Sequence, residues 1–173
     1  MNAPPVSLWR IGTEAPTYTA ADLSGVRAER TGGRWNRRGT PVVYLSTSRA
    51  LACLETLVHL SGRAALPLNR YLVGVDVSAA AWAARAVCDP ATLVGWDAEP
   101  AGMASLDWGE RWARSGATLL AEVPSVVVPE EANVLLNPRH PEAAPGAGVV
   151  AAAMVRRWMY DPHPGGRRPA GVR

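Results

Sequence analysis

This chain contains many short segments in which apolar and polar residues alternate, or in which β-branched and aromatic residues gather. Runs of about four to eight such residues, bounded by glycine or proline, are typical of strands. We therefore predict strands at residues 6–12, 41–46, 70–77, 118–123, 125–128 and 133–137. Pro124 and Pro129 separate the later segments, which favours edge or bulged positions there because proline donates no backbone hydrogen bond.

The clearest helical pattern covers residues 47–60, where a threonine or a serine can cap the first turn. At 100° per residue, Leu51, Leu54 and Val58 fall within about 60° of one another, so we expect them to form the buried stripe. Glu55 lies about 40° from Leu51, at the edge of this stripe. A carboxylate in that position needs a partner.

The remaining elements are shorter or ambiguous. A helix is predicted over residues 105–115 and a short one within 79–87, whereas 149–160 fit either a strand or a helix and 17–30 look irregular. Strands outnumber helices, and the two kinds of element do not alternate strictly. This pattern predicts an α+β fold, a single domain with a mixed, largely antiparallel sheet and short helices.

The composition of the 173 residues, 48% of them apolar, is that of a globular protein. No segment approaches the ~18 consecutive apolar residues of a membrane span, and no signal peptide is evident, so we expect a cytoplasmic protein without membrane contact. The net charge of +3 comes with 18 arginines and no lysine. Because these arginines are scattered along the sequence, no nucleic-acid binding is expected.

Two cysteines, Cys53 and Cys88, lie in apolar segments, where cysteine packs as a small hydrophobic residue. The histidines show no metal-ligand spacing, so neither a disulfide framework nor a metal site is predicted. We place the domain at residues 5–162. Residues 163–173 are expected to form a flexible tail, since they are rich in proline, glycine and arginine.

Arg34 and Tyr44 are candidate binding residues. Arg34 follows two glycines, and such a loop lets backbone N–H groups and a guanidinium converge on an anion. The alternative is a surface arginine in a turn. Tyr44 is either a half-buried strand aromatic or a platform on which a planar ring stacks.

Glu55 and Ser125 are, together with Arg34, candidates for the chemistry. Glu55 is either paired with an arginine or with His59 one turn later, or it stabilises a developing positive charge. The latter fits cleavage of a bond to a sugar carbon through an oxocarbenium-like state. The hydroxyl of Ser125 is either bonded to the backbone or used in a site, and without a G-x-S-x-G motif it is not read as a hydrolase nucleophile.

Taken together, these residues resemble the RES domain family, which is named for an arginine, a glutamate and a serine. The matching segments are LWRIG at 8–12, residues 32–60 beginning GGRWN, and residues 123–141 beginning VPSVVVP. Arg34, Glu55 and Ser125 fall on the three naming positions. Tyr44 falls on the family's tyrosine.

The resemblance implies a fold similar to that of ADP-ribosyltransferases and a toxin of a type II toxin–antitoxin pair. Such toxins deplete NAD⁺ by cleaving its nicotinamide–ribose bond, with phosphate or water as acceptor, as NAD⁺ phosphorylases or glycohydrolases. No cofactor is implied, because NAD⁺ is the substrate. The implied partner is an Xre-like antitoxin that covers the active site, so the toxin is expected to assemble at least with this protein.

The resemblance also implies roles for the matching residues. Arg34 would bind the pyrophosphate of NAD⁺ or an acceptor phosphate, and Tyr44 would stack on the nicotinamide. Glu55 would contact the ribose hydroxyls and stabilise the transition state. Ser125 would hydrogen-bond the nicotinamide or the ribose.

Arg10 is a secondary candidate for the phosphates, and His59 is a weaker candidate for the pocket wall. Two other functions stay open. A protein mono-ADP-ribosyltransferase would use the same fold with another acceptor. A non-enzymatic binding module would be expected to lack the hallmark residues.

Overall fold

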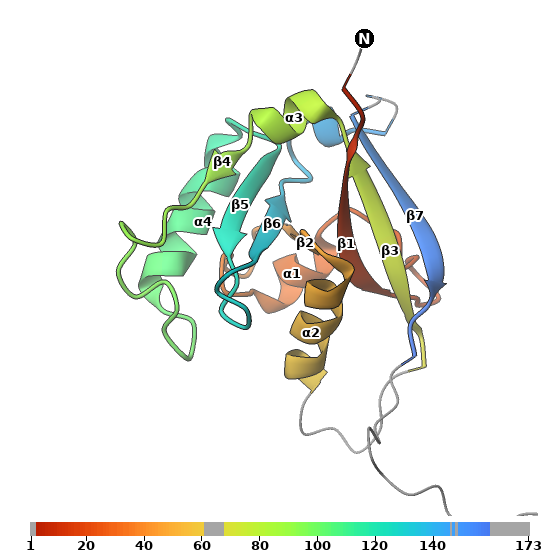
Figure 1. The fold of residues 1–173 in the computed structure, drawn as a ribbon, viewed down its shortest axis with the longest axis horizontal. Helices are drawn as coiled ribbons and strands as arrows, with labels where there is room; N and C mark the ends of the chain where they lie inside the picture. The colour runs from red at the N-terminus through yellow and green to blue at the C-terminus, as the bar shows by residue number, and fades with distance from the viewer. Residues whose placement is uncertain (1–2, 61–67, 146, 148, 160–173) are drawn as a thin grey trace, which may run out of the picture.

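Seven strands form one mixed sheet, in the order β4-β5-β6-β2-β1-β3-β7, in the computed structural model (Figure 1). The structure describes residues 3–60, 68–145, 147 and 149–159. The strands are β1 (Val6–Thr13), β2 (Val43–Ser46), β3 (Arg70–Val77), β4 (Ala86–Val87), β5 (Leu120–Pro124), β6 (Ala132–Leu136) and β7 (Val150–Arg157). Neighbouring strands are antiparallel except β4 and β5, which run parallel.

The helices are α1 (Val26–Thr31), α2 (Arg49–Leu60), α3 (Ala79–Ala83) and α4 (Met103–Ser115), with a 3₁₀ turn, η1, at Pro141–Ala143. The predicted α+β fold, with a mixed and largely antiparallel sheet and short helices, is confirmed. The predicted tail, residues 163–173, lies outside the described residues. In the described part of the chain, no helix has the length and apolar character that a membrane crossing requires.

The sheet divides between β1 and β2. β1 pairs with β3 along all 8 of its residues, whereas it pairs with β2 only between Trp9 and Ser46. Away from this single pair, β1 and β2 share no ladder. The division leaves room for a cavity inside the sheet.

Buried apolar side chains form three clusters that hold the elements in place. The first includes Leu8 and Leu136 in the sheet. The second joins α4 to the sheet through Trp112 and includes Trp35, and the third joins the end of α2 to the sheet through Leu60. These clusters fix the helices and loops that border the division between β1 and β2.

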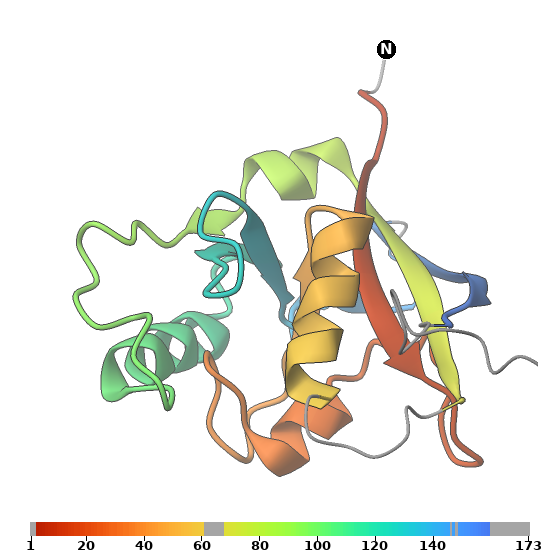
Figure 2. The same cartoon turned by 60° about the horizontal axis from the view of Figure 1, so that its bottom comes forward.

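α2 follows β2 and packs against β1 and β2 on one face of the sheet (Figure 2). Its buried residues are Leu51, Ala52 and Leu60, whereas Leu54 and Val58 are 40% and 48% exposed. The predicted buried stripe was therefore wrong for Leu54 and Val58. Apolar residues surround most of this helix, so their periodicity could not distinguish the face that meets the sheet.

The strand predicted at residues 125–128 is also wrong, because this segment forms a turn between β5 and β6. Ser125 Oγ accepts hydrogen bonds from the backbone N–H groups of Val127 and Val128, at 3.1 and 3.0 Å. A local bond of this kind satisfies backbone donors that a strand would pair with its neighbour.

The ambiguous segments form short elements. The helix predicted within residues 79–87 ends at Ala83, and β4 follows and extends the sheet beside β5. Of residues 149–160, which fitted either state, the described part forms the strand β7. Residues 17–30, which looked irregular, include most of α1.

Candidate active site

A cavity of about 530 Å³ lies where β1 and β2 diverge. Its walls come from β1, β2, α1, α2 and the loops near residues 32–35 and 124–127. The volume is within the range of about 300–1,000 Å³ that is usual for small-ligand sites. The sequence-predicted residues that line this cavity are Arg10, Arg34, Tyr44, Glu55 and His59.

The Glu55 carboxylate is held through one of its two oxygens. Ser125 Oγ donates a hydrogen bond to Oε1 at 2.8 Å, and Asn133 Nδ2 donates to the same oxygen at 2.5 Å. Ser46 Oγ donates to Asn133 Oδ1 at 2.8 Å, which fixes the orientation of the amide. Among the residues that the structure describes, none donates to Oε2. One carboxylate oxygen is therefore fixed, while the other is left for a ligand.

The interpretation in which Glu55 pairs with an arginine or with His59 is wrong. The partners of Glu55 are a hydroxyl and an amide, 70 and 78 residues away in sequence. His59 is exposed near the end of α2. The helical spacing of four residues suggested a local pair between Glu55 and His59. The fold instead supplies neutral partners from distant segments, so the negative charge of Glu55 is not neutralised by them.

Ser125 is fully buried in the turn that follows β5. Its hydroxyl donates to Glu55 and accepts the N–H groups of Val127 and Val128. A hydroxyl has one proton and two lone pairs, so its hydrogen-bonding capacity is used within the protein. This geometry favours a role in positioning Glu55, and direct contact of Ser125 with a substrate stays a prediction.

Tyr44 holds the loop that carries Arg34. The Tyr44 hydroxyl accepts the N–H of Trp35 at 3.0 Å and donates to Asn36 Oδ1 at 2.8 Å. Gly33 packs so closely that a Cβ there would lie 2.6 Å from this hydroxyl oxygen. Burial raises the pKa of the Tyr44 phenol, which therefore stays neutral. Because its hydroxyl is committed to the loop, the ring face is the part of Tyr44 that a ligand can meet.

The Arg34 guanidinium is bound to residues 96–99. Its Nη1 donates to the carbonyl oxygens of Trp96 and Ala98, at 3.1 and 2.8 Å, and its Nη2 donates to Glu99 Oε2 at 2.8 Å. The Arg34 side chain is 18% exposed, whereas that of Glu99 is 80% exposed. An ion pair with so exposed a carboxylate contributes little free energy, so an anionic ligand can replace Glu99.

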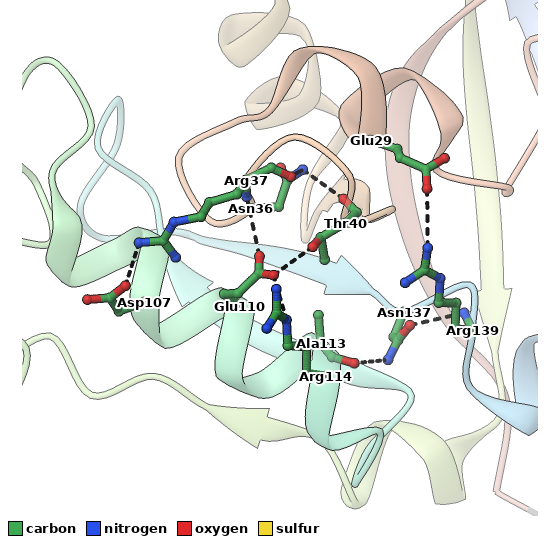
Figure 3. A network of polar contacts seen from close by, with 10 residues as sticks. All are labelled: Glu29, Asn36, Arg37, Thr40, Asp107, Glu110, Ala113, Arg114, Asn137 and Arg139. Atoms are coloured by element: carbon green, nitrogen blue, oxygen red, sulfur yellow. Dashed lines mark hydrogen bonds and ion pairs between the residues drawn. The ribbon is translucent and has the colours of Figure 1, made fainter.

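α4 anchors the far end of the same loop (Figure 3). Buried Glu110 accepts hydrogen bonds from Thr40 Oγ1 at 2.8 Å, the Arg37 N–H at 3.4 Å and Arg114 Nε at 2.8 Å. Asn36 Nδ2 donates to the carbonyl oxygen of Thr40 at 2.9 Å. Burial alone would raise the pKa of Glu110, but the three hydrogen bonds hold it below its ordinary value. The charged carboxylate thus holds the loop against α4.

Arg10 reaches the cavity from β1. Its Nη1 donates to the main-chain oxygen of Asp22 at 3.0 Å. Burial lowers the pKa of Arg10; the charge of Asp22 raises it, and the charges of Arg27 and Arg70 lower it again. A guanidinium stays protonated in proteins, so Arg10 presents a positive charge to the cavity.

Asn133 and Ser46 belong to the site, but sequence reasoning missed them. They lie directly opposite each other in the antiparallel pair of β2 and β6. The available signal was a polar residue at the end of one predicted strand and another at the start of a second. Such a signal acquires meaning only when the strand register is known.

Within the described ranges, no group of three histidine, cysteine, aspartate or glutamate side chains could hold a metal ion. Cys53 and Cys88 are free thiols. The guanidinium, hydroxyl and carboxylate groups that line the cavity suit an organic ligand that carries anionic and hydroxyl groups.

Comparison with known proteins identifies the family of this chain. The RES domain family matches residues 7–161. A protein of Sphingobium sp. (strain YBL2) named Prs ADP-ribosylating toxin is 55% identical over 157 residues, which are 90% of this chain and 94% of that protein. A protein of Pseudomonas putida named Toxin Res is 39% identical over 79% of this chain and 87% of its own length. A Toxin Res of Yersinia enterocolitica is 38% identical, over 71% and 79%. This chain belongs to the RES domain family.

Proposed function

We propose that this protein is a toxin that degrades NAD⁺ by cleaving the bond between nicotinamide and ribose. The observation that carries the proposal is the Glu55 carboxylate, which Ser125 and Asn133 fix through Oε1 at the wall of the cavity. A fixed negative charge stabilises an oxocarbenium-like transition state because it need not reorient as positive charge develops. The names of the relatives, each a toxin, support the biological role.

In the proposed reaction, the carbon–nitrogen bond between ribose and nicotinamide breaks, and its electron pair goes to the nicotinamide nitrogen. The ribose carbon gains oxocarbenium character, which the charge of Glu55 stabilises while Oε2 accepts hydrogen bonds from the ribose hydroxyls. Water or phosphate then adds to this carbon. Addition of water, with loss of a proton to solvent, gives ADP-ribose; addition of phosphate gives its phosphorylated form.

Arg34 and Tyr44 bind the dinucleotide in this proposal. The planar fork of Arg34 exchanges Glu99 for the pyrophosphate or an acceptor phosphate. The ring of Tyr44 stacks on nicotinamide, while its hydroxyl continues to hold the loop. NAD⁺ serves as substrate, and the proposed chemistry needs no further cofactor.

A second candidate function is mono-ADP-ribosylation of a protein. It is favoured by the name of the Sphingobium relative, an ADP-ribosylating toxin, which is 55% identical to this chain. The two functions share the cleavage step and differ in the acceptor, which here is a nucleophilic side chain of a target protein. Glu55 has the same role in both.

We further propose that the toxin acts in the cytoplasm and is paired with an Xre-like antitoxin of a type II system that covers the cavity. Leu54 and Val58 are 40% and 48% exposed on α2, and Val58 lines the cavity. The two side chains lie one turn apart on α2, and contiguous exposed apolar surface marks places that a partner covers.

Incubation of the purified protein with NAD⁺, with and without phosphate, tests the proposal. Release of nicotinamide without a protein acceptor supports NAD⁺ degradation, and the second product identifies water or phosphate as the acceptor. Transfer of label from NAD⁺ to an added protein fraction supports the second function. If no nicotinamide is released under any of these conditions, both functions are contradicted.

A further inference from the structure

Besides Arg34, a group of three arginines from three different elements lines the cavity. Arg10 comes from β1, Arg27 from α1 and Arg70 from β3. Two of them meet at Thr13, where Arg27 Nη1 donates to Oγ1 at 2.8 Å and Arg70 Nη1 donates to the same oxygen. Arg70 lies directly opposite Thr13 in the pairing of β1 and β3. The fold thus brings together charges that lie far apart in sequence.

Two members of this group, Arg10 and Arg27, bring positive charge to the cavity without a carboxylate partner among the described residues. Arg34, by contrast, forms an ion pair with Glu99. Asp22 attracts Arg10, while Arg27 and Arg70 repel it. Like charges gathered in a partly buried place raise the free energy of the protein, and a bound anion relieves this cost. The arrangement therefore favours an anionic ligand.

Two members of the group meet at the last residue of β1, beyond the pair that joins β1 to β2. Thr13 is four residues along β1 from Trp9, where β1 meets Ser46 of β2. At about 3.3 Å per residue, this corresponds to roughly 13 Å along the strand. Ser46 belongs to the hydrogen-bonded group that holds Glu55. An anion at Thr13 would therefore occupy the same cavity as Glu55, which reaches it from α2.

We propose that Arg10, Arg27 and Arg70, together with Thr13, form a subsite for a phosphate group. Guanidinium groups bind phosphate oxygens through paired N–H donors, and a hydroxyl can add a further contact. The phosphate is either part of the pyrophosphate of the dinucleotide or free inorganic phosphate. Assignment to the dinucleotide rests on the proposed function, whereas anion binding itself does not.

Anion binding is tested without turnover by titration calorimetry with inorganic pyrophosphate and, separately, with orthophosphate. Arg27→Gln is the informative variant, because Arg27 is exposed and its side chain donates to Thr13 from the surface of α1. We expect binding to weaken about tenfold in this variant. Arg111→Gln is the matched control, since Arg111 is exposed on α4 and does not line the cavity, and its affinity should equal that of the wild type. Equal affinities of the wild type and Arg27→Gln, or no binding by the wild type, would overturn the subsite.

Steady-state cleavage of NAD⁺ then identifies the source of the phosphate. If the subsite holds the pyrophosphate, Arg27→Gln raises KM for NAD⁺ about tenfold at unchanged kcat, with or without added phosphate. If it holds free phosphate, only the dependence of the rate on phosphate concentration changes. Suppose that the wild type binds either anion through Arg27 but releases no nicotinamide. The subsite then stands, and only the proposed function is contradicted.

Discussion

The two sides of the cavity hold their charged groups in different ways. On one side, Glu55 is fixed by Ser125 and Asn133, which belong to buried or sheet-bound segments, and these bonds use only one carboxylate oxygen. On the other side, Arg34 donates to two carbonyl oxygens and to the exposed carboxylate of Glu99. Glu55 therefore has one carboxylate oxygen available to a ligand, whereas Arg34 must give up its ion pair with Glu99 to bind one.

The difference separates two requirements of the proposed reaction. A charge that stabilises a transition state is most effective when it is already in place, because its reorientation would add to the barrier. A charge that binds a substrate phosphate can begin in a weak ion pair, since the exchange of one exposed carboxylate for a phosphate costs little. Each of the following four predictions concerns one side of the cavity.

The largest effect is expected for Glu55→Gln. Glutamine keeps the size of the side chain and an oxygen that can accept from Ser125 and Asn133, but it removes the negative charge. Nicotinamide release should fall by about 10²–10³-fold, while the circular dichroism and melting temperature stay those of the wild type. A variant that retains most of its activity contradicts the role of Glu55.

Asn133→Ala tests whether the fixed position of the carboxylate matters as well as its charge. Without the amide donor, Glu55 can turn away, and kcat should fall by about 10–10²-fold at nearly constant KM. Ser46→Ala removes only the bond that orients Asn133 and should have a smaller effect in the same direction. If kcat per folded molecule is unchanged in Asn133→Ala, the residue has a structural role only.

Glu110→Gln weakens the Arg34 side without altering the cavity wall. The loss of charge-assisted hydrogen bonds should lower the free energy of unfolding by about 1–3 kcal/mol at pH 7. Because the folded pKa of Glu110 is below its unfolded value, this stabilisation is present above the unfolded pKa and disappears as pH falls through the folded pKa. Urea unfolding over a pH series measures it. A stability difference that persists unchanged in acid contradicts a charge-dependent role.

The smallest effect is expected for Glu99→Gln. This change removes the charge with which a phosphate must compete for Arg34, so KM for NAD⁺ should fall by about two- to fivefold at constant kcat. Asp97→Gln, which alters a neighbouring carboxylate that forms no ion pair with described residues, is the control. A rise in KM for Glu99→Gln would show that Glu99 helps to bind the substrate.

The sequence was sufficient for the fold class and for much of the site. β-Branched and aromatic runs identified most strands, and the joint order of Arg34, Tyr44, Glu55 and Ser125 indicated the family. Taken singly, each of these residues had an ordinary structural explanation. Their spacing in the chain was informative because members of one family are expected to bring the same residues together in the folded protein.

What the sequence did not reveal depends on contacts between distant segments. Asn133 and Ser46 become partners only through the register of β2 and β6. The exposed positions of Leu54 and Val58 depend on which of the apolar faces of α2 meets the sheet. Local hydrogen bonds to Ser125 outweighed the strand pattern of the four residues that it begins.

The single pair between Trp9 and Ser46 has a consequence for how the cavity recognises its ligand. Sheet edges usually lie at the rim of a protein, where they are exposed to solvent and to other chains. Here, the edge of β1 that faces β2 borders the cavity, and outside the pair of Trp9 and Ser46 it forms no ladder with β2. Backbone N–H and C=O groups therefore supply part of the polar surface of this cavity wall. Substituting side chains does not remove these groups.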